Sequence, residues 1–457
     1  MLPRRELLAV GALPALLGLA APSIARAQLP VAARPGARRV ETFDLANGLK
    51  VLVLPSRRAP IVQQMLWYRV GSADEAPGKS GIAHFLEHLM FKGTPEVPAG
   101  EFSKRVSRVG GRDNAFTSFD YTAYHQNVAA DRLEMIMRME ADRMANLIVS
   151  EKELLPERDV ILEERRQVVE SRPSSLLDEV TREALFGRRA YGVPIIGYPE
   201  EIAKLGVDDA RSFHDLHYAP NNAILIVAGD TTVEAVRALA ERYYAPARPK
   251  TIPARVRPDA PAADLPRQVE RVDKRVAQPE WSRDYIAPSY RKGATEHAFG
   301  LQILTQVLGG HQTSRLYRSL VVDRKIALEA AAGYSARSLG LTAFGIGLSP
   351  APQRTIAEIE TAAMAEIERV RQDGVTAEEV ERAKRRLIAS TVYALDSMSS
   401  GPGLYGAALA TGGTVAEVDE WPERIAATTV AQVNAAARAT LDDKRAVTSL
   451  LLPETKR

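Results

Sequence analysis

The stretch His84-Phe85-Leu86-Glu87-His88 decides how the rest of this chain is interpreted. Its apolar residues favour a mostly buried helix, on which His84 and His88, four positions apart, lie one above the other. Glu87 leans toward the same side, where a carboxylate can act as a general base. Two imidazoles that face one point suit a metal ion, although a histidine on an apolar helix is more often a structural residue. The pattern therefore predicts a metal site only if the chain supplies a third ligand.

The composition limits both the class of protein and the kind of metal site. The chain has 457 residues, 46% of them hydrophobic, which is enough for more than one core and favours two domains. Its 60 basic and 57 acidic residues nearly balance, so nothing points to nucleic acid or an anionic membrane as a partner. Cysteine is absent, which leaves histidine and carboxylate to hold a metal. Of the seven histidines, His214 and His217 form a second spaced pair, but no inward-facing acid accompanies them, and we interpret them as structural residues.

Residues 1–27 have the pattern of a signal peptide. Arg4 and Arg5 precede an apolar run from Leu7 to Ala21, and Ala25-Arg26-Ala27 forms an A-x-A cleavage site. The paired arginines also fit twin-arginine export, although a general secretory signal can carry the same pair. We therefore expect a mature chain that is exported to the periplasm and has no membrane span.

Strand and helix patterns are mixed through the first half of the mature chain. The predicted strands lie at 40–54, 61–70 and 223–230, and the predicted helices at 132–146 and 151–170. The turn dipeptide Asn47-Gly48 makes the first of these strand regions a hairpin. This order predicts an α+β fold in which a mainly antiparallel sheet packs with helices.

Six prolines between Pro246 and Pro266 predict an extended, exposed linker, which is the best domain boundary. This linker, residues 246–266, separates an N-terminal domain at 38–245 from a C-terminal domain at 267–457. An offset of 226 residues matches 149–154 to 375–380 and His84 to Gly310, so we interpret the second domain as a diverged copy of the first. The same offset places Thr313 and Ser314 at the positions of Glu87 and His88, and we expect the second domain to bind no metal.

Helical periodicity in residues 151–170 favours one acid as the third ligand. Glu157, Ile161 and Glu164 share an apolar face, whereas Glu163 lies on a charged, solvated face. A carboxylate on an apolar face is costly unless it is paired or coordinated, which favours Glu164 as the ligand. Glu157 lies two turns earlier and suits a positioning role beside a ligand. Alternatively, Glu157 pairs with an arginine at the edge of the core.

Together these motifs resemble the pitrilysin and insulinase family of metallopeptidases, and most closely its processing-peptidase β-like bacterial members. The resemblance covers nearly all of the mature chain and includes Gly110-Gly111, Asn114-Ala115-Phe116-Thr117 and Asp120-x-Thr122-x-Tyr124. It implies two homologous domains and one zinc ion per chain, held by His84, His88 and Glu164, with Glu87 and Glu157 as the catalytic glutamates. It also implies that unstructured peptides are hydrolysed by metal-activated water. They would bind as an added strand at Asn114, Ala115, Phe116 and Thr117.

One feature of the family is absent from this sequence. Single-chain relatives supply from their second domain an arginine and, seven residues later, a tyrosine that stabilise the developing oxyanion. Val321 and Leu328 stand at these two positions and cannot donate hydrogen bonds, while Arg318, Arg324 and Tyr334 lie nearby. We therefore hypothesise a heterodimer with a homologous subunit that has no metal ligands and supplies the Arg and Tyr; a homodimer is the other arrangement. The alternative function is a catalytically weak structural or peptide-binding subunit of an exported complex.

Overall fold

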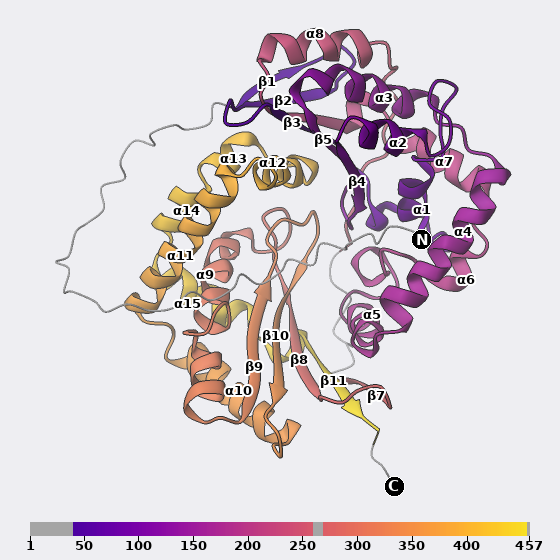
Figure 1. Ribbon diagram of the computed structural model, residues 1–457. Coiled ribbons are helices and arrows are strands. Elements are labelled where there is room, and N and C mark those ends of the chain that lie inside the picture. Colours follow the sequence, from indigo (N-terminus) through magenta and orange to yellow (C-terminus); the bar gives the residue numbers. More distant parts are fainter. Residues whose placement is uncertain (1–39, 259–267, 455–457) are drawn as a thin grey trace. The chain divides into compact units, whose positions relative to one another are not determined.

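The computed structural model describes residues 40–258 and 268–454, in two mixed sheets packed with helices (Figure 1). The signal peptide expected at residues 1–27 lies outside this part of the chain. Across residues 40–258 and 268–454, every helix is too short or too polar to cross a membrane. The α+β fold with two mainly antiparallel sheets, as expected from the sequence, is confirmed.

The first sheet holds the residues around the predicted metal site. Its strands are β1 (Glu41–Asp44), β2 (Lys50–Pro55), β3 (Ile61–Tyr68), β4 (Arg112–Thr117), β5 (Thr122–Ala129) and β6 (Ala223–Gly229). They lie in the order β1-β2-β6-β3-β5-β4, and only the β2–β6 pair is parallel. The predicted hairpin is present, with Phe43 opposite Val51. Strand β4 therefore forms one edge of this sheet.

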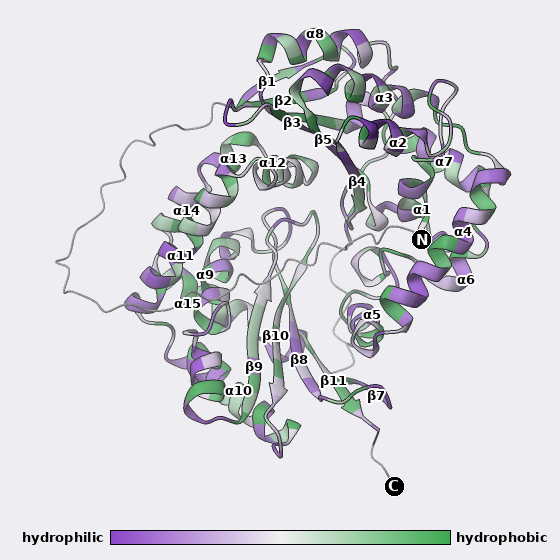
Figure 2. Cartoon of the chain, in the orientation of Figure 1, coloured by the Kyte–Doolittle hydropathy of each residue, from purple (hydrophilic) through white to green (hydrophobic). Residues whose placement is uncertain are grey.

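Helices cover one face of the first sheet. The helices of this half of the chain are η1 (Ser72–Asp74), α1 (Ile82–Leu89), α2 (Glu101–Arg108), η2 (Ala130–Arg132), α3 (Leu133–Asn146), α4 (Glu151–Arg165), the π-helical η3 (Arg166–Glu170), α5 (Pro173–Phe186), η4 (Ala190–Gly192), α6 (Pro199–Ile202), α7 (Val207–His217), η5 (Pro220–Asn222) and α8 (Val233–Tyr243). Helices such as α4 and α8 contain both hydrophilic and hydrophobic residues along their length (Figure 2), as expected for helices with one buried side. Val53 and Leu66 from the sheet pack with Phe85 from α1 in this core.

The second sheet repeats the strand order of the first without an equivalent of β1. Its strands are β7 (Gln268–Asp273), β8 (Glu280–Ala287), β9 (Ala327–Tyr334), β10 (Thr342–Pro350) and β11 (Ala446–Pro453), in the order β7-β11-β8-β10-β9. Only the β7–β11 pair is parallel. The helices are η6 (Thr295–His297), α9 (Ala298–Leu308), the π-helical η7 (Tyr317–Asp323), α10 (Ile356–Gln372), α11 (Ala377–Asp396), α12 (Ser400–Ala410), α13 (Val415–Asp419), α14 (Trp421–Ala427), α15 (Val430–Thr440) and η8 (Asp443–Arg445). This repeated order supports the interpretation of the second half as a copy of the first.

The single offset of 226 residues between the halves is wrong near α9. It fits the starts of α4 and α11, but β3 and β8 start 219 residues apart. Gly310 consequently lies beyond the end of α9, and Thr313 and Ser314 are not the structural counterparts of Glu87 and His88. The loops between elements differ in length in the two halves, so one register cannot hold throughout.

Each sheet uses its other face to contact a helix from the other half of the chain. Trp67 and Ile226 of the first sheet pack against Leu409 of α12. Val447 of the second sheet lies in a cluster with Leu185 of α5. These reciprocal contacts join the two halves through apolar surface.

The segment at 251–258 is exposed over half of its residues, but one of its side chains is buried. Val256 is 78% exposed, as expected, but Arg257 is only 6% exposed. The Arg257 guanidinium donates to Asp120 Oδ1 at 2.9 Å and to Asp74 Oδ1 at 2.7 Å, which explains its burial. The expectation of exposure is therefore wrong at Arg257. The rest of the proline-rich stretch, from residue 259, lies outside the described residues.

Candidate metal centre

Helix α1 is fixed at its start by backbone and side-chain contacts. Gly81 precedes it with φ of +87°, and a Cβ there would lie 2.6 Å from the carbonyl oxygen of Ile196, so both the turn and the close approach require glycine. The Glu75 carboxylate accepts hydrogen bonds from the Gly81 and Ala83 backbone N–H groups at 3.0 and 2.9 Å. These bonds satisfy N–H groups that the helix itself leaves without acceptors.

The two histidines of α1 face one point together with a carboxylate of α4. Glu164 Oε2 lies 3.8 Å from His84 Nε2 and 3.4 Å from His88 Nε2. Ligand atoms of all three residues lie within 4.8 Å of one another, and no other such group occurs in residues 40–258 and 268–454. Two atoms bound to zinc tetrahedrally at about 2.1 Å are about 3.4 Å apart, so this donor set fits one zinc ion.

Glu164 is held in place through its neighbour in α4. The Arg165 guanidinium is buried and donates to both carboxylate oxygens of Glu179 in α5, each at 2.8 Å. It also donates to the carbonyl oxygen of Gly197 at 2.8 Å. Because Gly197 contacts Gly81 at the start of α1, Arg165 connects the helix of Glu164 to the helix of the histidines.

Glu157 contacts the second nitrogen of His88. Its Oε1 lies 2.8 Å from His88 Nδ1, and its other oxygen pairs with Lys92. Burial works to lower the pKa of His88, but hydrogen bonds to Glu157 and Glu164 outweigh it and raise the pKa to about 9. Burial works to raise the pKa of Glu157, yet its bonds to His88 and Lys92 leave it lowered. A carboxylate at Nδ1 leaves Nε2 of His88 to face a metal.

Glu87 precedes His88 in α1 and is held by the edge strand β4. The Thr117 hydroxyl donates to Glu87 Oε2 at 2.7 Å, and Glu87 is 8% exposed. Helix α1 and strand β4 are in contact. A carboxylate so positioned beside a metal site can accept and return a proton.

The four residues expected to bind peptide form most of strand β4. Asn114, Ala115, Phe116 and Thr117 pair with β5 on one side only, with Asn114 opposite His125 and Thr117 opposite Thr122. Asn114 and Phe116 are exposed, and Thr117 connects the strand to Glu87. The strand therefore offers an edge for a further strand next to the general-base candidate.

Two of the residues near the positions of the family's Arg and Tyr have other contacts. Tyr334 donates its hydroxyl hydrogen to the carbonyl oxygen of Pro288 at 2.6 Å. Arg318 lies near the exposed Asp323, 3.8 Å away, with its side chain 74% exposed. Val321 packs against the core of the second half, and Leu328 is 47% exposed. None of these contacts supplies a donor to the site formed by His84, His88 and Glu164.

Sequence reasoning missed one member of the site. Lys92 pairs with Glu157, where an arginine at the core edge was the expected alternative. Lys92 follows His88 by four residues, so helical spacing extended past His88 would have indicated it. His214 and His217, in α7, belong to no group of metal ligands among the residues that the structure covers. His214 instead stacks on Tyr218 with ring centroids 5.2 Å apart.

The fold and this donor set define a class of metallopeptidase, and comparison with known families agrees. Residues 50–197 match the family described as Insulinase (Peptidase family M16), and residues 204–387 match the Peptidase M16 inactive domain. The chain belongs to this insulinase family, peptidase family M16, which confirms the resemblance seen in the sequence.

Individual relatives agree with this assignment. The zinc protease PqqE of Helicobacter pylori is 31% identical over 372 residues, which cover 80% of this chain and 82% of PqqE. The uncharacterized zinc protease YmxG of Bacillus subtilis is 26% identical, with 79% of this chain and 86% of YmxG covered. The relatives are thus named as zinc proteases.

Solved structures resemble this fold over most of its length. A protease from Helicobacter pylori superposes with a TM-score of 0.84 at 28% identity, covering 91% of this chain and all of that one. The periplasmic protease PqqL from Escherichia coli has a TM-score of 0.77 at 22% identity, covering 92% of this chain and 48% of PqqL. At that identity the second likeness concerns the fold alone.

Proposed function

We propose that this chain is a zinc-dependent endopeptidase that hydrolyses unstructured peptides, and that it is the catalytic subunit of a heterodimer. The observation that carries the proposal is the convergence of His84, His88 and Glu164 within 4.8 Å, with Glu87 on the same helix. Membership of family M16 and the zinc proteases among the relatives support this reaction class.

The residues of the site have separate roles in this proposal. His84 and His88, through Nε2, and Glu164, through its carboxylate, would hold one zinc ion. Bound there, zinc would supply Lewis acidity that activates water and polarises a peptide carbonyl. Glu87 accepts a proton from the attacking water and delivers it to the leaving amine, while Thr117 holds the Glu87 carboxylate in place. Glu157 orients His88 from the Nδ1 side.

The substrate in this proposal is an extended peptide backbone. A peptide added antiparallel or parallel to β4 would gain main-chain hydrogen bonds along Asn114–Thr117 and pass beside Glu87. Such pairing recognises the peptide backbone rather than the side chains, so it favours substrates of many sequences over a sharp sequence preference. Folded proteins have few free extended segments to offer.

The second half of the chain supports a divided active site. Val321 and Leu328 cannot donate hydrogen bonds to a developing oxyanion, so a homologous partner without metal ligands would supply that function. The chain covers only 48% of PqqL, whose single chain has room for two such units, and this supports pairing of two homologous chains. We infer domains at 38–245 and 267–457, with the metal site in the first.

We place this function in the periplasm. Residues 1–27 have a charged start, an apolar run and an A-x-A cleavage site. PqqL, a neighbour in fold, is a periplasmic protease. N-terminal sequencing of the exported protein should begin at Gln28; a mature chain that retains Arg4 and Arg5 would contradict this placement.

The proposal is tested by hydrolysis of a quenched fluorescent peptide library by the purified mature chain. The assay is run with and without chelator, and with and without the homologous chain encoded nearest to it. We expect chelator-sensitive cleavage that rises when the homologue is added. An inactive Glu87→Gln variant in the same mixture assigns the activity to this chain.

The other outcomes discriminate the parts of the proposal. Full activity of the chain alone would contradict the divided site and leave the peptidase function standing. Cleavage in neither sample, with zinc bound, would instead favour the structural or peptide-binding subunit. Activity that persists in excess chelator would contradict metal dependence.

A further inference from the structure

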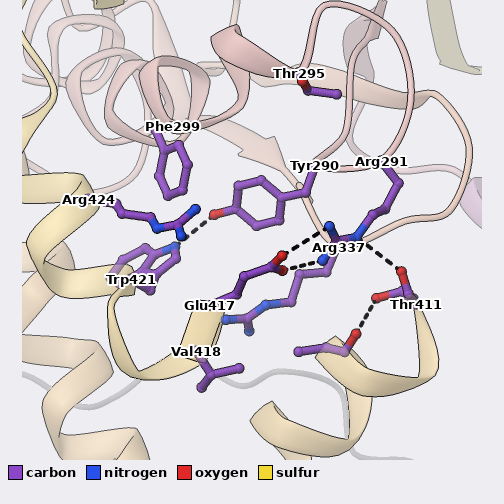
Figure 3. Close-up of a pocket in the computed structure, with 11 residues that line it drawn as sticks. Tyr290, Arg291, Thr295, Phe299, Arg337, Thr411, Glu417, Val418, Trp421 and Arg424 are labelled. Carbon is purple, nitrogen blue, oxygen red and sulfur yellow. Dashed lines mark hydrogen bonds and ion pairs between the residues drawn. The ribbon is translucent and has the colours of Figure 1, made fainter. Parts of the chain in front are cut away.

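A small cavity lies in the second half of the chain, away from the residues of the metal site. It is bounded by the loops after β8 and β9, by α9 and by helices α12 to α14 (Figure 3). Its volume is about 170 Å³. An engineered protein cavity of about 150 Å³ accepts benzene, so this cavity has room for one ring-sized molecule.

The cavity has more cationic than anionic side chains. Arg291, Arg337 and Arg424 line it, against the single carboxylate of Glu417. Glu417 pairs with Arg291, and Arg424 pairs with Glu420 at 3.0 Å. Among these three lining arginines, Arg337 is therefore the cation that remains without a carboxylate.

Arg337 lies in the loop between β9 and β10 and is partly buried. Within residues 40–258 and 268–454, its guanidinium has neither a hydrogen bond nor an ion pair, and no dashed line reaches it in Figure 3. Burial lowers the pKa of Arg337, and the hydroxyls of Tyr290 and Tyr121 offset this only in part. A partly desolvated guanidinium with five N–H donors and no acceptor favours a bound anion.

Tyr290 supplies a second donor to the same cavity. Trp421 Nε1, which can only donate, lies 2.8 Å from the Tyr290 hydroxyl and 3.2 Å from Gln302 Oε1. Because Gln302 Oε1 accepts from Trp421, the amide nitrogen of Gln302 faces Tyr290. The Tyr290 hydroxyl oxygen therefore accepts hydrogen bonds from both Trp421 and Gln302. Its own hydrogen is left to donate elsewhere, and Tyr290 lines the cavity.

Aromatic rings form an apolar wall beside these donors. The rings of Tyr290 and Phe299 are 5.0 Å apart, and Trp421 is 5% exposed. Such a wall favours a ligand with an apolar, preferably planar, body. Inorganic ions have no surface that would gain from it.

We propose that this cavity binds a small organic carboxylate, whose charged end pairs with the Arg337 guanidinium and the Tyr290 hydroxyl and whose ring-sized body packs on Phe299 and Trp421. A guanidinium fork matches a carboxylate with two parallel hydrogen bonds. The carboxylate belongs either to a free acid or to the C-terminus of a short peptide. The site is independent of the proposed peptidase function.

Calorimetry on the full mature chain tests the site, with sodium benzoate as the probe and neutral benzamide as its isostere at equal ionic strength. We expect benzoate to bind at least about tenfold more tightly than benzamide, as for a charge-assisted bond. Arg337→Gln should weaken benzoate binding about 10- to 100-fold and Tyr290→Phe about 3- to 10-fold. The control Arg57→Gln removes the same charge at an exposed position and should leave binding unchanged.

Further probes identify the source of the carboxylate and can overturn the proposal. Binding of the dipeptide Gly-Phe, but not of its amide, would assign the site to peptide C-termini, whereas binding of benzoate alone would assign it to free acids. Equal binding of benzoate and benzamide, or unchanged binding in folded Arg337→Gln, overturns the site. Tighter binding of inorganic phosphate than of benzoate overturns the ligand class. If Arg337→Gln does not fold, unchanged benzoate binding in Tyr290→Phe overturns the site in its place.

Discussion

The Nδ1 atom of His88 lies 2.8 Å from Oε1 of Glu157, although the two residues are 69 positions apart in the sequence. The contact joins α1 to α4 and leaves the Nε2 atom of His88 directed at Glu164. Lys92 pairs with the second oxygen of Glu157. The Glu157 carboxylate, whose charge is balanced by Lys92, thus sets the tautomer and the orientation of His88, one of the candidate metal ligands.

Substitution of Glu157 by glutamine should weaken zinc binding. The amide is neutral and can turn its NH₂ group toward His88, so it supports the imidazole less well than a carboxylate. We expect the zinc dissociation constant, measured by competition with a chromophoric chelator, to rise about 10- to 100-fold.

Glu163→Gln is the matched control for this substitution. Glu163 lies on the same helix but is exposed, with its carboxylate bonded to Arg166 and Gln167. The control should bind zinc as the unaltered chain does. Equal affinities in both variants would show that Glu157 does not position His88.

Two glycines of α12 should respond oppositely to alanine. A Cβ on Gly406 would lie 2.0 Å from the ring of Trp67, so Gly406→Ala should reduce the free energy of unfolding by about 1 to 3 kcal/mol or more. A Cβ on Gly403 meets nothing within 4 Å, so Gly403→Ala should stabilise the helix by about 0.5 to 1 kcal/mol. Urea unfolding of both variants measures the difference, and similar stabilities would contradict the packing of α12 on the first sheet.

The stability of the fold should depend on the protonation of Asp284 in β8. Burial and the charge of Asp178 raise the pKa of Asp284 to about 7, against the lowering effect of Arg182. Because the folded chain binds this proton more tightly than the unfolded chain, the stabilisation is full below about pH 4 and is lost as pH rises through 7. Between pH 5 and pH 8 the loss amounts to about 2 to 3 kcal/mol.

Asp284→Asn isolates this effect, because the amide does not titrate. From pH 5 to pH 8, the free energy of unfolding of the original chain should fall by that amount relative to the free energy of unfolding of the variant. Urea midpoints of the metal-free proteins provide the measurement. A difference that is the same at both pH values would contradict a raised pKa for Asp284.

Much of the fold, and the proximity of His84, His88 and Glu164, could be predicted because the necessary information is local. The spacing of His84 and His88 places both on one face of any helix, and the periodicity of α4 separates Glu164 from the solvated Glu163. Strand alternation around Asn47-Gly48 likewise predicts the first hairpin. Helical and strand periodicity therefore predicts single helices and strands and the side chains that share a face on each of them.

Contacts between distant elements could not be predicted in the same way. The burial of Arg257 depends on Asp74 and Asp120, which a proline-rich composition does not reveal. The equivalence of His84 and Gly310 failed because loop lengths differ between the halves. Such features depend on how elements meet, which is set by long-range packing rather than by local pattern.

In the proposed function, Glu87 handles the proton at a zinc site built by His84, His88 and Glu164. The most direct measurement determines zinc content and peptide hydrolysis in the same preparation of Glu87→Gln, with the homologous chain present. We predict zinc content equal to that of the unaltered chain and hydrolysis reduced at least about 10²- to 10⁴-fold, as for loss of a general base. An unchanged rate in the zinc-loaded variant would remove Glu87 from the mechanism and contradict the account.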